Sequence, residues 1–201
     1  MKLASGSAFV SAIALLVGGC ASVPSEAFYT LNAGLAGGAA RAASGPERLR
    51  SAVMAPPALP ELVDRPQLVL RTGPQQVSLL EQERWAEPLR AQIARVVAED
   101  LETLLGDWRI ATREDVLVAP ECRVNLDVRR FEVSRAGPAV SDVLWRVACA
   151  DGFARTGRAA AAEPVVGSAG RDGLSPVVAA HGRALDRLSQ DLATALREAA
   201  R

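Results

Sequence analysis

The chain has 201 residues, and its 23 lysines and arginines balance 23 aspartates and glutamates, so the formal charge at pH 7 is zero. This neutral balance argues against a protein that charge alone holds to nucleic acid or to an anionic surface. Lys2 is the only lysine, which excludes a Walker A phosphate loop and a Schiff-base lysine. One histidine and three cysteines cannot fill a usual four-ligand zinc site without carboxylates. We therefore expect neither a metal site nor a cofactor.

The amino terminus has the pattern of a bacterial export signal. Lys2 precedes an apolar run at residues 8–17, which is too short to span a bilayer. The run ends in Val17-Gly18-Gly19-Cys20, which resembles a lipobox, in which the cysteine becomes the first mature residue and is acylated. The alternative is an ordinary signal peptide with an incidental cysteine.

Three segments follow from this interpretation: a signal peptide at 1–19, a lipidated tether at 20–26 and one folded domain at 27–201. The residue after Cys20 is Ala21 and not aspartate. By resemblance to bacterial lipoprotein sorting, this predicts anchoring at the periplasmic face of the outer membrane.

The first half of the domain is predicted to be rich in strands. A short β-prone run, Phe28-Tyr29-Thr30-Leu31, precedes a glycine- and alanine-rich segment at 32–46, which we expect to be a mobile loop. Residues 50–55 predict a strand that Pro56-Pro57 stops. Two further strands, 67–71 and 76–80, predict a hairpin around Gly73-Pro74.

Two stretches have the apolar spacing of amphipathic helices. The central one has apolar residues on one face from Leu89 to Leu105, with Pro88 in its first turn and Gly106 at its end. The terminal one opens with Ser175 as the predicted N-cap and a proline at the first helical position, then keeps helical spacing to the carboxyl end.

Between the helices, two alternating segments, 122–133 and 142–149, predict a second hairpin with a bulge near Arg129-Arg130. Residues 153–166 have a weaker pattern and predict an edge strand. The expected fold is therefore a single α/β domain with a mixed or largely antiparallel sheet, packed with two long amphipathic helices.

Cys122 and Cys149 fall on the apolar faces of the two strands of this second hairpin. If they are paired, their positions centre the turn between Arg135 and Ala136, inside the predicted loop. Opposed residues in such a ladder lie about 4.5 to 5.5 Å apart at Cα, within reach of a disulfide. Because an exported chain meets an oxidising compartment, we expect a Cys122–Cys149 bridge. The alternative is two buried free thiols.

His181 is the only imidazole available for a catalytic pair. It lies on the apolar face of the terminal helix, where a hydrogen-bonded core or interface histidine is the better interpretation. No Gly-x-Ser-x-Gly elbow occurs, and the carboxylates are scattered over predicted solvated faces. We therefore expect no enzyme; a hydrolase that uses His181 is the alternative. Trp85, between strand and helix, is interpreted as an aromatic that packs helix on sheet, with contact to a partner as its alternative.

Several segments together resemble the ABC-type transport auxiliary lipoproteins, the PqiC-like group. They are the lipobox, Phe28-Tyr29-Thr30-Leu31, a strand that ends at Pro56, Leu59-Pro60-Glu61-Leu62-Val63-Asp64-Arg65-Pro66-Gln67-Leu68-Val69 and Glu83-Arg84-Trp85-Ala86-Glu87-Pro88-Leu89. Further along the chain, the strand Val128-Arg129-Arg130-Phe131-Glu132, Trp145 and the terminal helix continue the resemblance. The long loop at 32–46 and the two body cysteines depart from it.

The resemblance implies a single α/β domain without enzymatic activity. Members are outer-membrane lipoproteins that work with an MCE-domain substrate-binding protein and an ABC permease and ATPase to move lipids or other hydrophobic compounds. We also expect a homo-oligomer, and the neutral charge predicts no nucleic-acid partner. The candidate interface residues are those of the specific motifs: Pro60, Asp64, Arg65, Pro66, Arg84, Trp85 and Pro88. The alternative function is a stand-alone envelope lipoprotein that binds lipid or stabilises another membrane complex.

Overall fold

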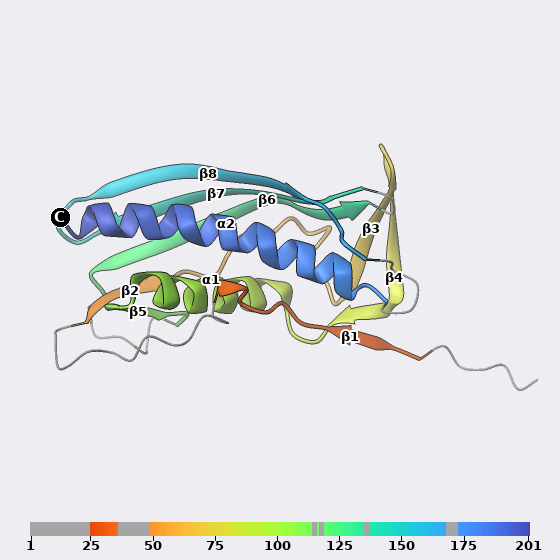
Figure 1. The fold of residues 1–201 in the computed structure, drawn as a ribbon, viewed down its shortest axis with the longest axis horizontal. Coiled ribbons are helices and arrows are strands. Elements are labelled where there is room, and N and C mark those ends of the chain that lie inside the picture. The colour runs from red at the N-terminus through yellow and green to blue at the C-terminus, as the bar shows by residue number, and fades with distance from the viewer. Residues whose placement is uncertain (1–24, 36–48, 114–115, 117–118, 135–136, 168–172) are drawn as a thin grey trace, which may run out of the picture.

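A computed structural model describes residues 25–35, 49–113, 116, 119–134, 137–167 and 173–201. The predicted signal peptide, Cys20 and residues 36–46 of the predicted mobile loop lie outside these ranges. Both helices lie on the same side of a mixed sheet (Figure 1). The helices are α1 (Leu89–Leu105) and α2 (Ser175–Ala199). The strands are β1 (Ala27–Tyr29), β2 (Arg50–Met54), β3 (Gln67–Gly73), β4 (Gln76–Trp85), β5 (Trp108–Ala111), β6 (Cys122–Ser134), β7 (Ala139–Cys149) and β8 (Ala154–Glu163).

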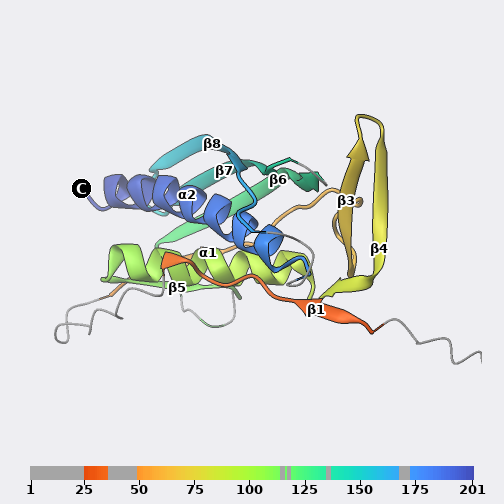
Figure 2. The same ribbon diagram turned by 45° about the vertical axis from the view of Figure 1, so that its right-hand side comes forward.

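The long strand β6 organises the sheet. Along one edge it pairs antiparallel with β7, which pairs in turn with β8. Its other edge is shared by two strands, because β2 pairs with it near Cys122 and β3 pairs with it only at Val133 and Ser134. Beyond β2 lies β5, and beyond β3 lie β4 and then β1. The sheet therefore splits into two branches, and the β3–β4 hairpin stands away from β6, β7 and β8 (Figure 2).

The single α/β domain, its mixed sheet and the two long helices confirm the predicted fold class. Both predicted hairpins are present, and β8 is an edge strand that pairs only with β7 among the described strands. Strand β5 was not predicted. It has only four residues, too few to show an alternating pattern, and its parallel partner β2 is far away in the sequence.

Both helix starts differ from the prediction by one position. Pro88 is the N-cap of α1 and not part of its first turn, since its ψ of 127° is extended and not helical. In α2, Leu174 is the N-cap and Ser175 is the first helical residue, so no side chain caps this helix. Gly106 ends α1 with a φ of 73°, a left-handed conformation that glycine adopts without a steric cost.

The register between β6 and β7 places the two cysteines of the body opposite each other. Pairing is regular from Cys122↔Cys149 to Val128↔Val143 and then shifts by one residue before Arg130. The predicted bulge is therefore present, and it lies on the turn side of the cysteines, where it leaves their register intact. In the structure the two sulfur atoms are 2.00 Å apart in a disulfide.

The core lies between the sheet and the two helices. Both helices contribute stripes of buried aliphatic side chains, and a smaller second cluster lies where α2 begins, near the branch point of the sheet. The members of this second cluster are Leu70, Val133, Ala139, Val177 and Ala180. Among the described residues, no helix is both long enough and apolar enough to cross a membrane.

Candidate functional site

Three of the segments that the resemblance singled out meet at one end of the molecule. Phe28 and Tyr29 of β1 pair with Arg84 and Trp85 of β4, in parallel. The backbone N–H of Trp85 donates to the carbonyl of Pro66 at 2.7 Å. The motifs around residues 28, 66 and 85 thus form one continuous layer, in which the chain just after the predicted tether is held by hydrogen bonds.

The motif residues have mainly structural contacts in this layer. Trp85 is 8% exposed and belongs to the main core, so its geometry favours the packing interpretation. Asp64 forms an ion pair with Arg90 of α1. The guanidinium of Arg84 lies 3.4 Å from the carboxylate of Glu26.

The remaining motif residues stabilise turns. The guanidinium of Arg65 donates to the carbonyl of Glu61 at 3.2 Å. The carbonyl of Pro60 accepts the N–H groups of Val63 and Asp64, and the carbonyl of Pro88 accepts those of Ala91 and Gln92. These contacts give the motif residues roles in holding the turns and the layer together.

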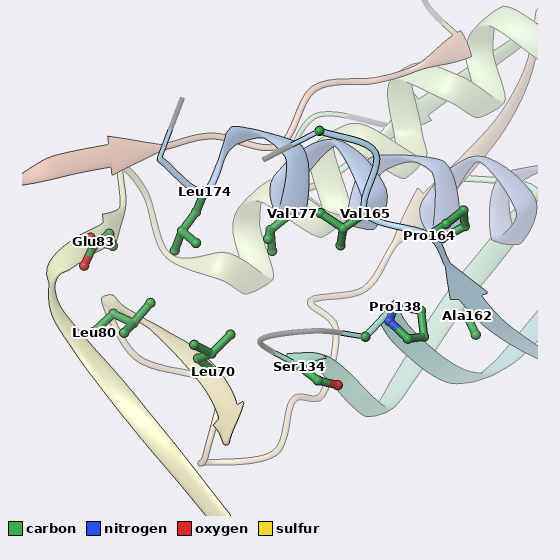
Figure 3. Close-up of a pocket in the computed structure, with 12 residues that line it drawn as sticks. Leu70, Leu80, Glu83, Ser134, Pro138, Ala162, Pro164, Val165, Leu174 and Val177 are labelled. Carbon is green, nitrogen blue, oxygen red and sulfur yellow. The ribbon is translucent and has the colours of Figure 1, made fainter. Parts of the chain in front are cut away.

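Beside this layer, the divergence of the β3–β4 hairpin from β6 leaves a cavity of about 720 Å³ (Figure 3). One wall is the hairpin, and the opposite wall consists of the start of α2, the end of β8 and the segment after it. The residues that line it are Leu70, Leu80, Glu83, Ser134, Gly137, Pro138, Ala162, Pro164, Val165, Gly167, Leu174 and Val177. We refer to it as the hairpin cavity.

Most of the described residues that line the hairpin cavity have aliphatic side chains, and Glu83 is the ionisable one among them. The side chain of Glu83 forms no hydrogen bond or ion pair with the residues that the structure describes. Concave, largely apolar sites of 300 to 1,000 Å³ with few polar groups are typical of small-molecule binding sites. No sequence motif predicted this cavity, because it results from the separation of two sheet branches and not from any local pattern.

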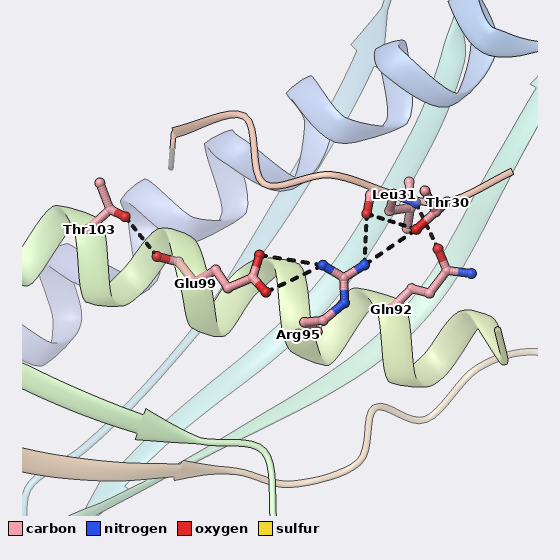
Figure 4. A network of polar contacts seen from close by, with 6 residues as sticks. All are labelled: Thr30, Leu31, Gln92, Arg95, Glu99 and Thr103. Carbon is pink, nitrogen blue, oxygen red and sulfur yellow. Dashed lines mark hydrogen bonds and ion pairs between the residues drawn. The ribbon is translucent and has the colours of Figure 1, made fainter. Parts of the chain in front are cut away.

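The chain that follows β1 runs along α1 and passes Asp186 of α2 at Gly34 before it leaves the described region. We call residues 30–35 the strap. Its Leu31 N–H donates to Gln92 Oε1 at 2.7 Å, and its Leu31 carbonyl accepts from Arg95 at 2.9 Å, while Arg95 also contacts Glu99 (Figure 4). The Leu35 N–H donates to Asp100 at 3.2 Å. The strap therefore joins the amino-terminal chain to α1 at several points.

Asp100 is fully buried between the helices, where it also accepts a hydrogen bond from Ser189 of α2 at 3.2 Å. Burial raises its pKa to about 6, and the nearby carboxylate of Asp186 adds to that rise. The same burial raises the pKa of Asp186. Asp100, Asp186 and Ser189 lie under the strap, and none of them lines the hairpin cavity.

His181 is a core residue. Its ring stacks on Phe131 with centroids 4.0 Å apart, and burial lowers its pKa to about 3. The predicted hydrogen bond is not found at Nδ1, which is buried and has no partner among the described residues. A neutral imidazole stacked on an aromatic ring inside the core has no access to a substrate, so the geometry does not support a hydrolase built on His181. Within the described ranges, no cluster of three or more histidine, cysteine or acidic side chains could hold a metal ion.

Two solved structures have a fold similar to that of this chain. The fold is similar to the crystal structure of an uncharacterized protein, with a TM-score of 0.66, 17% identity, and 86% of this chain and 99% of that chain covered. It is also similar to the crystal structure of protein XCC0632 from Xanthomonas campestris, described as a DUF330 protein, with a TM-score of 0.56, 18% identity, and 87% and 99% covered. At these identities the similarity shows the fold alone.

Comparison of the sequence, unlike that of the fold, identifies the family. No curated protein matches the chain. The model of the ABC-type transport auxiliary lipoprotein component matches residues 29–193, which begin at the last residue of β1 and include both hairpins and most of α2. The chain therefore belongs to the ABC-type transport auxiliary lipoprotein family.

Proposed function

We propose that this protein is the lipid-anchored docking subunit of an envelope ABC transport system that moves lipids or other hydrophobic compounds. The observation that supports it best is the family match over residues 29–193, since auxiliary lipoproteins of that family serve ABC-type transporters. In this proposal the subunit has no catalytic role, and its partners are an MCE-domain substrate-binding protein together with the permease and ATPase.

The anchor in this proposal is acylated Cys20, after removal of residues 1–19. Several acyl chains on one residue would hold a near-neutral domain at a membrane, because each buried CH₂ contributes about 0.8 kcal/mol. The tether at 20–26 leads directly into β1, which pairs with β4 beside the motif layer. The attachment site is proposed to be the periplasmic face of the outer membrane.

A homo-oligomer is part of the same proposal. Strand β8 has ten residues and pairs only with β7 among the described strands, so one of its edges is open. An open edge of that length is a surface that a second copy can cover by strand pairing. The mass of the purified protein in mild detergent, measured by light scattering, tests this directly: a monomer over the working concentration range would exclude it.

Affinity capture tests the docking role. The tagged wild-type chain and a Cys20→Ser variant are expressed from the native locus, and each is recovered from cross-linked envelopes. We expect an MCE-domain protein and the permease with the wild type, and a strong reduction with Cys20→Ser, which no longer sorts with the outer membrane. A His181→Phe variant is the matched control for a core change and should recover the same partners. Recovery of bound lipid but of no transporter component from the wild type would favour the stand-alone lipoprotein instead.

A further inference from the structure

Opposite walls of the hairpin cavity present aliphatic side chains that an acyl chain can contact. Leu70 and Leu80 from the hairpin face Val165, Leu174 and Val177 from the other side (Figure 3). The site combines residues of β3, β4, β8 and α2, so it depends on the whole fold. A cavity of about 720 Å³ with such walls suits one hydrocarbon chain and is too small for the face of a folded partner.

The charge at the cavity restricts the polar end of that ligand. Glu83 is the ionisable group among the described residues of the lining, and Arg84 next to it is paired with Glu26. A carboxylate without a partner among the described residues repels a second anion, such as the carboxylate of a free fatty acid. It attracts a group that donates hydrogen bonds or has positive charge, such as a primary ammonium.

The location of the cavity suggests the source of the ligand. Glu83 pairs with Ala27, the first residue of β1, and the Leu174 N–H donates to the Tyr29 hydroxyl at 3.0 Å. Ala27 lies seven positions after Cys20, which corresponds to at most about 25 Å of extended chain. If Cys20 is acylated as proposed above, this end of the domain stays within that distance of the membrane surface.

We propose that the hairpin cavity binds one acyl chain of a membrane phospholipid, with an ammonium-bearing headgroup such as phosphatidylethanolamine placed beside Glu83. This inference rests on the proposed function for its anchor, and adds to it a binding site in the auxiliary subunit itself. The ligand would reach the cavity from the leaflet to which the tether is attached.

A displacement titration tests the proposal. The mature chain with Cys20→Ser, exported behind a cleavable signal peptide of the non-lipoprotein type, is loaded with the neutral fluorophore phenylnaphthylamine. Palmitoyl lysophosphatidylethanolamine or palmitoyl lysophosphatidylglycerol is then added below its critical micelle concentration. We expect displacement by both lipids at a stoichiometry of one, with the ethanolamine lipid up to about fivefold tighter, the range for one partly exposed ion pair.

Two variants assign the binding to this cavity. Ala162 lines it and is itself exposed on β8, so Ala162→Phe fills the cavity without crowding the core, and should weaken both lipids at least on the order of tenfold. The matched control is Ala160→Phe, an exposed alanine two residues earlier on the same face of the strand and outside the lining, which should leave binding unchanged. Glu83→Gln should remove the preference for the ethanolamine lipid and keep chain binding.

Three results would overturn the proposal: no displacement by either lipid, equal loss in Ala160→Phe and Ala162→Phe, or no effect of Ala162→Phe. The same titration on the acylated wild type tests whether the acyl chain in the cavity comes from the protein's own Cys20. Weak fluorophore binding there, restored by Cys20→Ser, would mean that the protein's own acyl group fills the cavity and would reject a phospholipid. If Ala162→Phe loses lipid binding but still captures the partners, the cavity and the docking role are separate. If the wild type binds lipid but captures no partner, the docking role is rejected and the lipid site is not.

Discussion

The two ends of strand β6 are built in opposite ways. At its first residue, Cys122 is 2% exposed, pairs with Ala52 of β2 on one side and is bonded to Cys149 of β7 on the other. At its last residues, β6 pairs with β3 at only two positions before the strands separate and the hairpin cavity begins. The first end is closed by a covalent bond, and at the other end β3 leaves β6 beside the amino-terminal chain.

This difference suggests that one end of β6 stabilises the fold and the other end is available for binding. A closed end with fully buried Ala52, Val53 and Met54 holds the sheet in register. An open end can then contain a cavity without loss of the fold. If stability depends on the closed end and binding on the open end, changes at the closed end should lower the free energy of unfolding without affecting lipid binding. Changes in the cavity at the open end should weaken lipid binding without affecting the free energy of unfolding.

The largest effect is expected from Trp85→Ala, which removes a buried aromatic where the open end meets the core. We expect a loss of about 3 to 5 kcal/mol in the free energy of unfolding, measured by urea titration. Trp85→Phe keeps an aromatic ring and is the matched control, with a smaller loss. Unchanged stability together with lost partner capture would reject the packing role and support the alternative, a direct contact of Trp85 with a partner.

A somewhat smaller effect is expected from replacing both Cys122 and Cys149 with alanine. The bridge spans a sequence separation of 27, for which loop closure predicts a loss of about 3 to 4 kcal/mol on removal. Lipid binding should not change while the variant is folded, because the bridge lies at the far end of β6 from the cavity. Mass spectrometry of the unreduced protein is the direct check of the bridge itself, since two alkylatable thiols besides Cys20 would contradict it.

The smallest effect depends on pH and concerns the region between the two ends. Burial raises the pKa of Asp100 from 3.8 to about 6, so its ionisation costs more in the folded than in the unfolded state. Below about pH 4 Asp100 is protonated in both states and does not destabilise the fold. As the pH rises from about 4 to about 6 the unfolded state loses its proton first, so the free energy of unfolding falls, and above about pH 6 this loss stays constant. Asp100→Asn should stabilise the protein at pH 7 by roughly 1 to 3 kcal/mol and by little at pH 4.

Urea unfolding of the wild type and of Asp100→Asn between pH 4 and 7.5 measures this difference. His181, whose pKa burial lowers to about 3, acts in the opposite direction, because acidification below about pH 6.5 favours the unfolded state. The comparison of the two proteins at each pH cancels that contribution. Asp191→Asn, which removes an exposed carboxylate on the same helix bundle, is the control for the change of charge alone. An equal gain for Asp100→Asn at both pH values would contradict the role of burial.

The elements that sequence analysis predicted share a property: their signals are local. The helix from Leu89 to Leu105 and the hairpin of β6 and β7 each have a repeated apolar spacing over many residues. Even the pairing of Cys122 with Cys149 followed from a regular antiparallel register across one turn. The turn chemistry at Gly106 likewise involves only neighbouring residues.

The features that sequence analysis missed arise from contacts between distant segments. Strand β5 is four residues long and is stabilised by parallel pairing with β2. The hairpin cavity exists because β3 joins β6 at Leu70 and Arg71 only. The motif residues stay a predicted interface; what the sequence did not predict is that Asp64 and Arg84 make ion pairs within the chain. Sequence resemblance located the important layer but not the contacts inside it.

The parallel pairing of β1 with β4 has a mechanical consequence for an anchored protein. A pull along the strand from the amino-terminal side acts in shear on the β1–β4 hydrogen bonds, so that they resist together and do not open one after another. The strap then passes any remaining tension to α1 through Gln92, Arg95 and Asp100. A force applied at the membrane would therefore act first on β4, which includes Glu83 of the hairpin cavity, and then on α1 through the strap.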